Sequence, residues 1–171
     1  MRPILGAGMI LTGFLGMGLY LCEREEIKLR ILTEWKLSLQ ILCNEISSRH
    51  QPMIFALWEC GKRIRGEVGE FYKNTSIRAE ENRGELPKIW REELRHYFKR
   101  TTLSGEEKRM MEPLEDMLGY EDEQVQLEML KHQIDSIDNC RKEIAEKKRE
   151  KKKIILLLST CSGMVVILLL I

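Results

Sequence analysis

The chain has 171 residues, of which 28 are Lys or Arg and 27 are Asp or Glu. This near-neutral balance argues against a general nucleic-acid-binding protein, which needs a basic face to release counterions from phosphates. Apart from Arg2, every charged residue lies between Glu23 and Lys153, so a polar middle separates two apolar ends.

The first apolar stretch, residues 3–22, is long enough to cross a bilayer as a helix. A cleaved signal peptide is the competing interpretation. However, only Arg2 and the amino terminus supply positive charge before the stretch, and no small-residue cleavage site lies near its end. We therefore expect a retained transmembrane helix. Gly8, Thr12 and Gly16 recur at intervals of four, which places them on one helix face where another membrane helix can approach closely.

Residues 24–49 are predicted to form a long amphipathic helix that continues from the first span. The apolar residues that recur at steps of three and four are Ile27, Ile31, Trp35, Leu39, Leu42 and Ile46.

Pro52 should end this helix region and start the next, because proline suits a first helical turn. We expect a helix from Pro52 to about Cys60, a break, and a second helix through Tyr72. The polar residues 74–84 are predicted to form a loop.

Leu86 and Pro87 begin a further predicted helix, in which basic residues alternate with aromatic ones. A helix with this pattern can bind nucleic acid. Here, however, Trp90 and Tyr97 have the spacing of residues on the buried face of a helix, and Glu92 interrupts the basic pattern. Core packing with a solvated opposite face is the preferred interpretation.

Ser104 and Glu107 have the spacing of a capping box, in which each side chain satisfies a free backbone N–H group of the other residue. The helix that follows should kink at Pro113 and end at Gly119 in a left-handed cap. Asp122 can cap the last helix, which no Gly or Pro interrupts before the final apolar stretch.

Residues 147–153 are dominated by Lys and Arg, and residues 154–171 carry no charge. A helix over the uncharged stretch would be about 27 Å long, close to the hydrocarbon thickness of a bilayer. Ser159 and Gly163 again place small residues on one face. Because cations flank spans on the cytoplasmic side, we expect the middle domain to be cytoplasmic and both termini to lie outside.

The predicted fold class is therefore all-α, since no alternating strand pattern occurs. A cytoplasmic bundle of about six helices, residues 23–153, should lie between transmembrane helices at 3–22 and 154–171. The first and last helices carry the two spans and should run antiparallel, side by side.

Few residues have a pattern suited to chemistry. The five cysteines show no Cys-x-x-Cys spacing and an odd number, which favours a reducing compartment and apolar packing roles. His132 with Glu128 comes nearest to a metal-ligand spacing, and a surface pair is the better interpretation. We expect no enzymatic activity and predict no catalytic, cofactor-binding or metal-binding residues.

The chain resembles the stage III sporulation protein AB family over nearly its full length. The residues that carry the resemblance are Leu5-Gly6, Glu45-Ile46, Pro52, Ala56, Phe71, Thr102-Leu103, Glu106-Glu107, Leu118-Gly119, Asp122 and Gln126, with the Lys-rich approach to a terminal span. The acidic run at residues 23–26 departs from the family pattern, as do Pro113 and the long polar stretch.

This resemblance implies a part in a secretion-like channel complex between mother cell and forespore, located in the mother-cell membrane around the forespore. It also implies a soluble domain similar to the cytoplasmic domains of the inner-membrane platform proteins of type II secretion and type IV pilus systems. The implied partners are an ATPase of the stage III sporulation protein AA type and other membrane components of the complex.

The leading hypothesis is a non-enzymatic membrane platform or adaptor that recruits or couples to this cytoplasmic ATPase. The alternative is a helical membrane protein for signalling or regulation. A third possibility is lipid binding through residues 147–153, which would attract anionic headgroups, although orienting the span is a sufficient role for them. No cofactor and no nucleic-acid partner are expected.

The turn around Leu118, Gly119, Asp122 and Gln126 carries the densest resemblance. Its expected role is structural, a helix end and a helix start, and a partner-binding role is the alternative.

Overall fold

The computed structural model of the chain describes residues 2–81, 86–118 and 122–170, with side chains for 23–81, 86–118, 122–155 and residue 157. These residues form helices and short connections without a strand, so the predicted all-α class is confirmed for the described part. The chain comprises two compact units. The bundle unit is Arg30–Arg141, and the helix-pair unit combines Met1–Leu29 with Lys142–Ile171.

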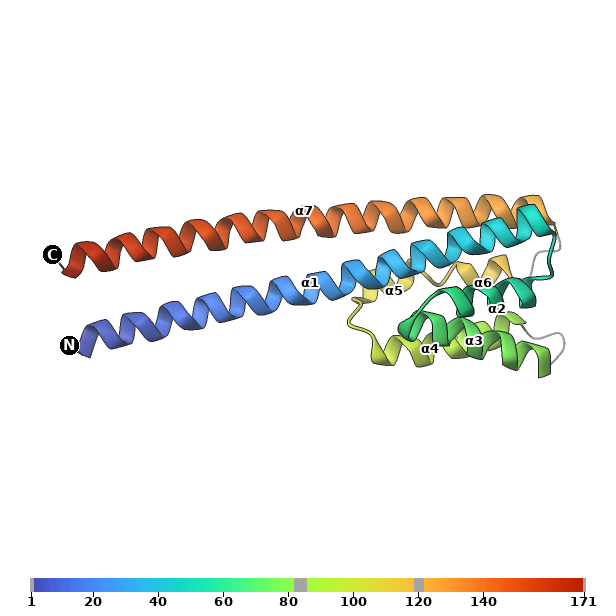
Figure 1. The fold of residues 1–171 in the computed structure, drawn as a ribbon, viewed down its shortest axis with the longest axis horizontal. Helices are drawn as coiled ribbons and strands as arrows, with labels where there is room; N and C mark the ends of the chain where they lie inside the picture. Colours follow the sequence, from blue (N-terminus) through green and yellow to red (C-terminus); the bar gives the residue numbers. More distant parts are fainter. Residues whose placement is uncertain (1, 82–85, 119–121, 171) are drawn as a thin grey trace. The chain divides into compact units, whose positions relative to one another are not determined.

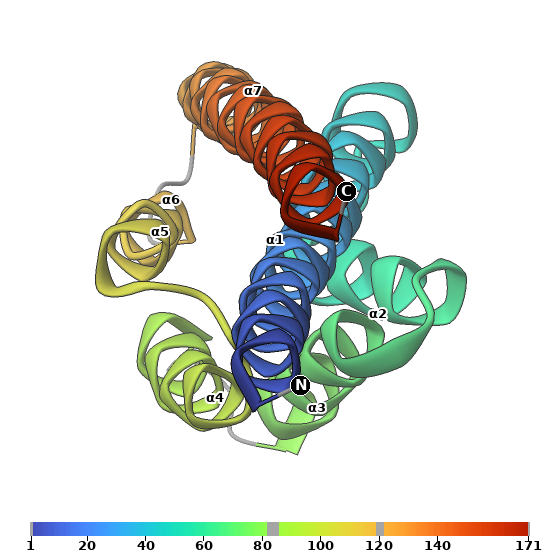
Figure 2. The same ribbon diagram turned by 90° about the vertical axis from the view of Figure 1, so that its left-hand side faces the viewer.

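The bundle unit is built on α1 (Arg2–Arg49), which enters it at Arg30. The helices that follow are α2 (Met53–Arg63), α3 (Gly66–Glu81), α4 (Leu86–Arg100), α5 (Gly105–Arg109), α6 (Leu114–Met117) and α7 (Glu123–Leu170), which leaves the unit after Arg141. Figure 1 labels these helices, and Figure 2 shows α2, α3, α4 and α6 in this order around the bundle.

Five aromatic side chains form the centre of the bundle unit. Trp35 of α1 is fully buried, with its ring 5.2 Å from Phe71, 5.6 Å from Tyr72, 6.3 Å from Trp90 and 5.5 Å from Tyr97. Tilted and edge-on pairs at these distances stabilise a core beyond the burial of apolar area alone. The periodicity that predicted Trp35 as a core residue is thus confirmed.

Three of these aromatic residues, Trp35, Tyr72 and Tyr97, have partners for their polar atoms, whereas the buried Trp90 Nε1 has no hydrogen-bond partner among the described residues. Trp35 Nε1 donates a hydrogen bond to Tyr97 Oη at 3.0 Å, and Ser38 Oγ lies 2.9 Å from Tyr72 Oη and 2.7 Å from the Trp35 carbonyl oxygen. These bonds fix the rotation of α1 against α3 and α4, because a buried donor or acceptor without a partner costs about 1 to 3 kcal/mol.

The break between α1 and α2 lies where Pro52 predicted it. His50 has a φ of 47°, in the left-handed region, which turns the chain out of the α1 helix. The next break was predicted near Cys60, but α2 continues to Arg63 and Gly66, with a φ of 77°, then starts α3. Glycine tolerates this conformation at no steric cost.

The prediction of a loop over 74–84 was wrong for residues 74–81, which form the last turns of α3. Thr75 and Ser76 are polar but buried, and each finds a backbone partner. Thr75 Oγ1 donates to the Phe71 carbonyl oxygen at 2.8 Å, and Ser76 Oγ donates to that of Ile54 in α2 at 3.0 Å. Packing of α3 against α2 therefore overrides the polar local sequence.

The predicted capping box opens α5. The Glu107 backbone N–H donates to Ser104 Oγ at 3.4 Å, and the Ser104 N–H donates to Glu107 Oε2 at 2.6 Å. The prediction of one helix with a kink at Pro113 was wrong: α5 ends at Arg109, residues 110–113 form a turn, and Pro113 directly precedes the separate short helix α6. Proline suits the start of a helix, where its missing N–H is not needed.

Ser104→Ala is expected to lower the free energy of unfolding by about 1 kcal/mol, the usual contribution of an N-cap hydroxyl. Thermal unfolding of the full chain, followed by circular dichroism, measures the change. Ser47→Ala, at an exposed position within α1, should stay within about 0.5 kcal/mol of the parent chain. Equal losses in both variants would contradict a capping role.

Helix α7 runs antiparallel to α1 within the bundle unit. Lys36 Nζ lies 2.7 Å from Asp138 Oδ1, and His50 Nδ1 lies 3.0 Å from Glu123 Oε2. The helix continues without interruption to Leu170, so the prediction of an unbroken last helix is confirmed.

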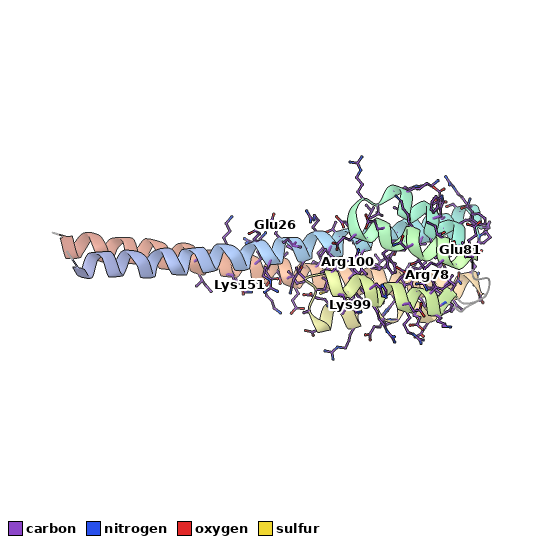
Figure 3. The ribbon with its side chains drawn as sticks, turned by 90° about the horizontal axis from the view of Figure 1, so that it is seen from below. Glu26, Arg78, Glu81, Lys99, Arg100 and Lys151 are labelled. Carbon is purple, nitrogen blue, oxygen red and sulfur yellow. The ribbon has the colours of Figure 1, made fainter. Side chains whose placement is uncertain are left out.

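In the helix-pair unit, the described parts of α1 and α7 also run antiparallel (Figure 1). Lys148 Nζ is 3.1 Å from Glu26 Oε2, and Lys151 Nζ is 3.2 Å from Glu25 Oε1. Figure 3 labels Glu26 and Lys151 on these two helices. The acidic run that departs from the family pattern thus pairs with the basic run of α7.

Over the part of the chain with described side chains, no helix is both long enough and apolar enough to cross a membrane. The predicted spans at 3–22 and 154–171 fall almost wholly on residues whose side chains are not described, as do Gly8, Thr12, Gly16, Ser159 and Gly163. These spans and their packing faces stay predictions.

Candidate functional site

Three residues of the predicted turn region at the start of α7, Leu118, Asp122 and Gln126, lie within the described part of the chain and have structural contacts. Leu118 is buried, with 8% of its surface exposed. Asp122 caps α7, because its Oδ1 accepts a hydrogen bond from the Gln124 backbone N–H at 2.8 Å. The Gln126 N–H donates to the Asp122 carbonyl oxygen at 3.1 Å, and the Gln126 side chain is half-buried. Gly119 lies outside the described residues, and a partner-binding role for this turn stays a prediction.

A groove lies beside this turn, between α6 and α7. Its volume is about 450 Å³. The lining residues are Pro113, Leu114, Met117, Glu128, Met129, His132 and Gln133. Gln133 Nε2 donates a hydrogen bond to the Met110 carbonyl oxygen, which holds the turn before α6 against α7. The floor is mainly apolar, and Glu128 supplies a negative charge at an exposed position.

A second hollow, of about 210 Å³, lies between α3 and α4 and is acidic. Glu67, Glu70 and Glu93 line it, together with His96 and Arg100. Burial raises the pKa of the nearby Glu34 carboxyl, with a further increase from Glu67 and an opposing effect of Arg30. No group of three His, Cys, Asp or Glu side chains within the described residues could hold a metal ion.

His132 and Glu128, the pair with the nearest metal-ligand spacing, are both exposed on α7. They lie at the α6–α7 groove, which the sequence did not indicate.

A buried carboxylate links the ends of α1 and α2. The Glu45 side chain is 3% exposed, and its two oxygens lie 3.0 Å from Arg49 Nη1 and 2.9 Å from Arg63 Nη2. A buried charge needs such partners because its removal from water is costly. Glu45 therefore fixes the position of the C-terminal end of α2.

Glu45→Gln is expected to lower the free energy of unfolding by about 1 to 3 kcal/mol, because it removes charge-assisted bonds to both arginines. Glu143→Gln is the matched control. Its exposed carboxylate pairs with Lys147 one turn along α7, where a surface ion pair contributes less than about 1 kcal/mol. Thermal unfolding of both full-length variants measures the difference, and a larger loss in the control would contradict this role of Glu45.

Cys60 has a packing role. Cys60 is fully buried, and its Sγ donates to the Ser38 carbonyl oxygen at 3.4 Å. Burial raises the pKa of the Cys60 thiol well above its usual range, and Glu45 adds to this increase. A thiol kept protonated and away from solvent is a poor nucleophile.

Cys60 is therefore expected to resist maleimide labelling at pH 8 in the folded chain by about 100-fold relative to Cys140, which is half-buried. Peptide mapping by mass spectrometry after timed labelling measures both rates. Denaturation should remove the difference. Comparable labelling of the two cysteines in the folded chain would contradict the buried position of Cys60.

The surface of α2 carries two large exposed aromatic side chains. Phe55 is 58% exposed and Trp58 is 38% exposed, whereas Ala56, Leu57 and Cys60 of the same helix are fully buried. Exposed aromatic residues are common centres of protein interfaces.

Comparison with known proteins gives two similarities. A family model described as "Stage III sporulation protein AB" matches residues 3–171. A solved structure described as stage III sporulation protein AB is similar with a TM-score of 0.66 and 17% sequence identity, over 72% of this chain and 98% of that chain. At this identity the structural similarity shows the fold alone. No curated protein matches the sequence.

Proposed function

We propose that this chain, which belongs to the stage III sporulation protein AB family, is a non-enzymatic membrane platform. It couples a cytoplasmic ATPase to the secretion-like channel complex between mother cell and forespore. Family membership gives the chain a role in sporulation. The platform role and the ATPase coupling are the proposed refinements.

The observation that carries the proposal is the continuity of α1 and α7. Each helix has 48 residues and runs from the bundle unit to one of the two apolar stretches, 3–22 and 154–171. If those stretches span the membrane, a force on the bundle reaches the bilayer through two helices and not through a flexible linker. Such a connection suits a protein that transmits the work of an ATPase.

The packing within the bundle unit also supports a protein-binding role. Its buried titratable side chains have structural partners, as with Glu45 and its two arginines, and the thiol of Cys60 is protonated. Exposed Phe55 and Trp58 offer surface for a protein contact. These observations favour binding over chemistry in the described part of the chain.

Binding of the ATPase tests the proposal. The full chain, reconstituted in lipid nanodiscs, should retain a purified ATPase of the stage III sporulation protein AA type, and empty nanodiscs should not. Circular dichroism of the retained sample checks that the bundle is folded. A folded chain that fails to retain the ATPase at any accessible concentration would overturn the coupling. A change of helix packing on addition of a small ligand would favour the signalling alternative.

The proposed location is the mother-cell membrane around the forespore, with the bundle on the cytoplasmic side. Labelling of Cys140 tests the orientation, because a membrane-impermeant maleimide added outside intact cells should reach this residue only after permeabilisation. Labelling without permeabilisation would reverse the orientation.

A further inference from the structure

One face of α2 combines apolar and basic side chains. Phe55, Trp58 and Lys62 are spaced by three and four residues, which places them on one side of the helix. We call these three residues the α2 stripe. The Lys62 side chain is 48% exposed and its Nζ pairs with Glu59 of the same helix. Arg65, two residues after the end of α2, is also exposed.

The most deeply buried residues of α2 lie opposite the α2 stripe. Leu57 and Cys60, on the opposite face of α2, are fully buried. Ser76 Oγ and the Ile54 carbonyl oxygen join α3 to α2 without any residue of the stripe. Phe55 and Trp58 therefore leave apolar surface area exposed to water, which is unfavourable in free energy. A partner surface that covered this area would remove the cost.

The α6–α7 groove is complementary to the α2 stripe, because it combines apolar with acidic side chains. Its floor contains Leu114, Met117 and Met129, and methionine adapts readily to the shape of an inserted side chain. Glu128 lines the groove. Two further exposed carboxylates, Glu112 and Asp116, are adjacent in sequence to the lining residues Pro113 and Met117. An apolar insert flanked by cations would fit this surface.

We propose that the α2 stripe of one copy docks into the α6–α7 groove of a second copy of this chain. Trp58 and Phe55 contact the apolar floor, and Lys62 lies near Glu128. The groove volume of about 450 Å³ falls within the usual range of sites that enclose a small molecule or a few side chains.

The position of the two surfaces determines the type of assembly. Both belong to the bundle unit, and Figure 2 shows α2 and α6 on opposite sides of it. One copy therefore contacts its neighbours through two different surfaces. Such a heterologous contact repeats from copy to copy and produces a ring where the rotation closes.

The proposed contact buries little surface area and is therefore weak. Three side chains and a shallow groove bury far less than the roughly 1,200 Å² of a stable complex. The copies therefore associate where they are concentrated in one plane, and remain largely separate in dilute solution.

Photo-crosslinking in the full chain tests the contact. Trp58 is replaced by p-benzoylphenylalanine, the variant is reconstituted in liposomes at high density, and the irradiated adducts are mapped by mass spectrometry. We expect a two-copy adduct between position 58 and residues within 112–133. No two-copy adduct, or an adduct to residues 55–65 of the second copy, would overturn the proposal.

Charge reversal provides the second measurement. Lys62→Glu or Glu128→Lys alone should lower the yield of the adduct by about fivefold or more. The double variant should restore the yield, because the two reversed charges meet across the contact. Arg95→Glu, an exposed reversal on α4, is the matched control and should leave the yield unchanged.

A double variant with a yield as low as those of the single variants, or a loss in the control as large as theirs, would count against the contact. Unchanged thermal unfolding of each variant shows that the bundle remains folded. The assay contains no ATPase, so its outcome is independent of the proposed coupling.

Discussion

Trp35→Ala is expected to lower the free energy of unfolding of the bundle by about 3 to 5 kcal/mol, the range for removing a large aromatic side chain from a core. Trp35 is fully buried and contacts four aromatic rings, so its loss leaves a cavity that the surrounding helices cannot fill without moving. The Tyr97 hydroxyl also loses the Trp35 N–H that donates to it.

Thermal unfolding of the full chain measures this loss, with near-ultraviolet circular dichroism to follow the packing of the remaining aromatics. Trp35→Phe should recover part of the stability, because it restores ring packing but leaves Tyr97 without its donor. Gln40→Ala, at an exposed position of α1, is the surface control and should change stability by less than about 0.5 kcal/mol. A similar change for Trp35→Ala and Gln40→Ala would show that the aromatic cluster is not the core.

Gly69→Ala is the second substitution with a large expected effect, a loss of about 3 kcal/mol. Alanine favours helices over glycine by about 1 kcal/mol, so local propensity alone predicts a gain at this position in α3. A Cβ atom at residue 69 would, however, lie 2.0 Å from the Ile64 carbonyl oxygen and 2.8 Å from its carbon. Both obstacles are backbone atoms, which cannot rotate away, so the chain before α3 must shift.

Gly105→Ala is the matched control, because an added Cβ there meets nothing within 4 Å. This variant should be neutral or slightly more stable than the parent chain. Thermal unfolding of the two full-length variants should therefore show a loss of stability in Gly69→Ala and none in Gly105→Ala. A gain of stability in Gly69→Ala would mean that α2 and α3 do not approach as closely as the structure places them.

Much of the secondary structure could be predicted from short-range patterns. The capping box at Ser104 and the cap at Asp122 depend on atoms a few residues apart, and each lies where the sequence indicated. The extension of α3 through Ser76 could not be predicted in this way. Its hydroxyl is buried only because the Ile54 carbonyl oxygen of another helix accepts its hydrogen bond.

The candidate site was less accessible to prediction than the fold. The turn from Leu118 to Gln126 was singled out by resemblance, and its described residues act as core and cap. The groove beside it joins residues of α6 to residues of α7 that are distant in sequence, so no local pattern indicates it.

Local patterns in the chain define the helical class, most helix starts and the division into two apolar ends and a charged middle. These features follow from backbone capping, helical periodicity and the separation of charged from apolar residues, all of which act over one or two turns. Long-range packing, in contrast, selects which apolar residues of α2 are core and which are surface. Leu57 and Phe55 are equally hydrophobic in a helical pattern, and the position of α3 and α1 buries the first and leaves the second exposed.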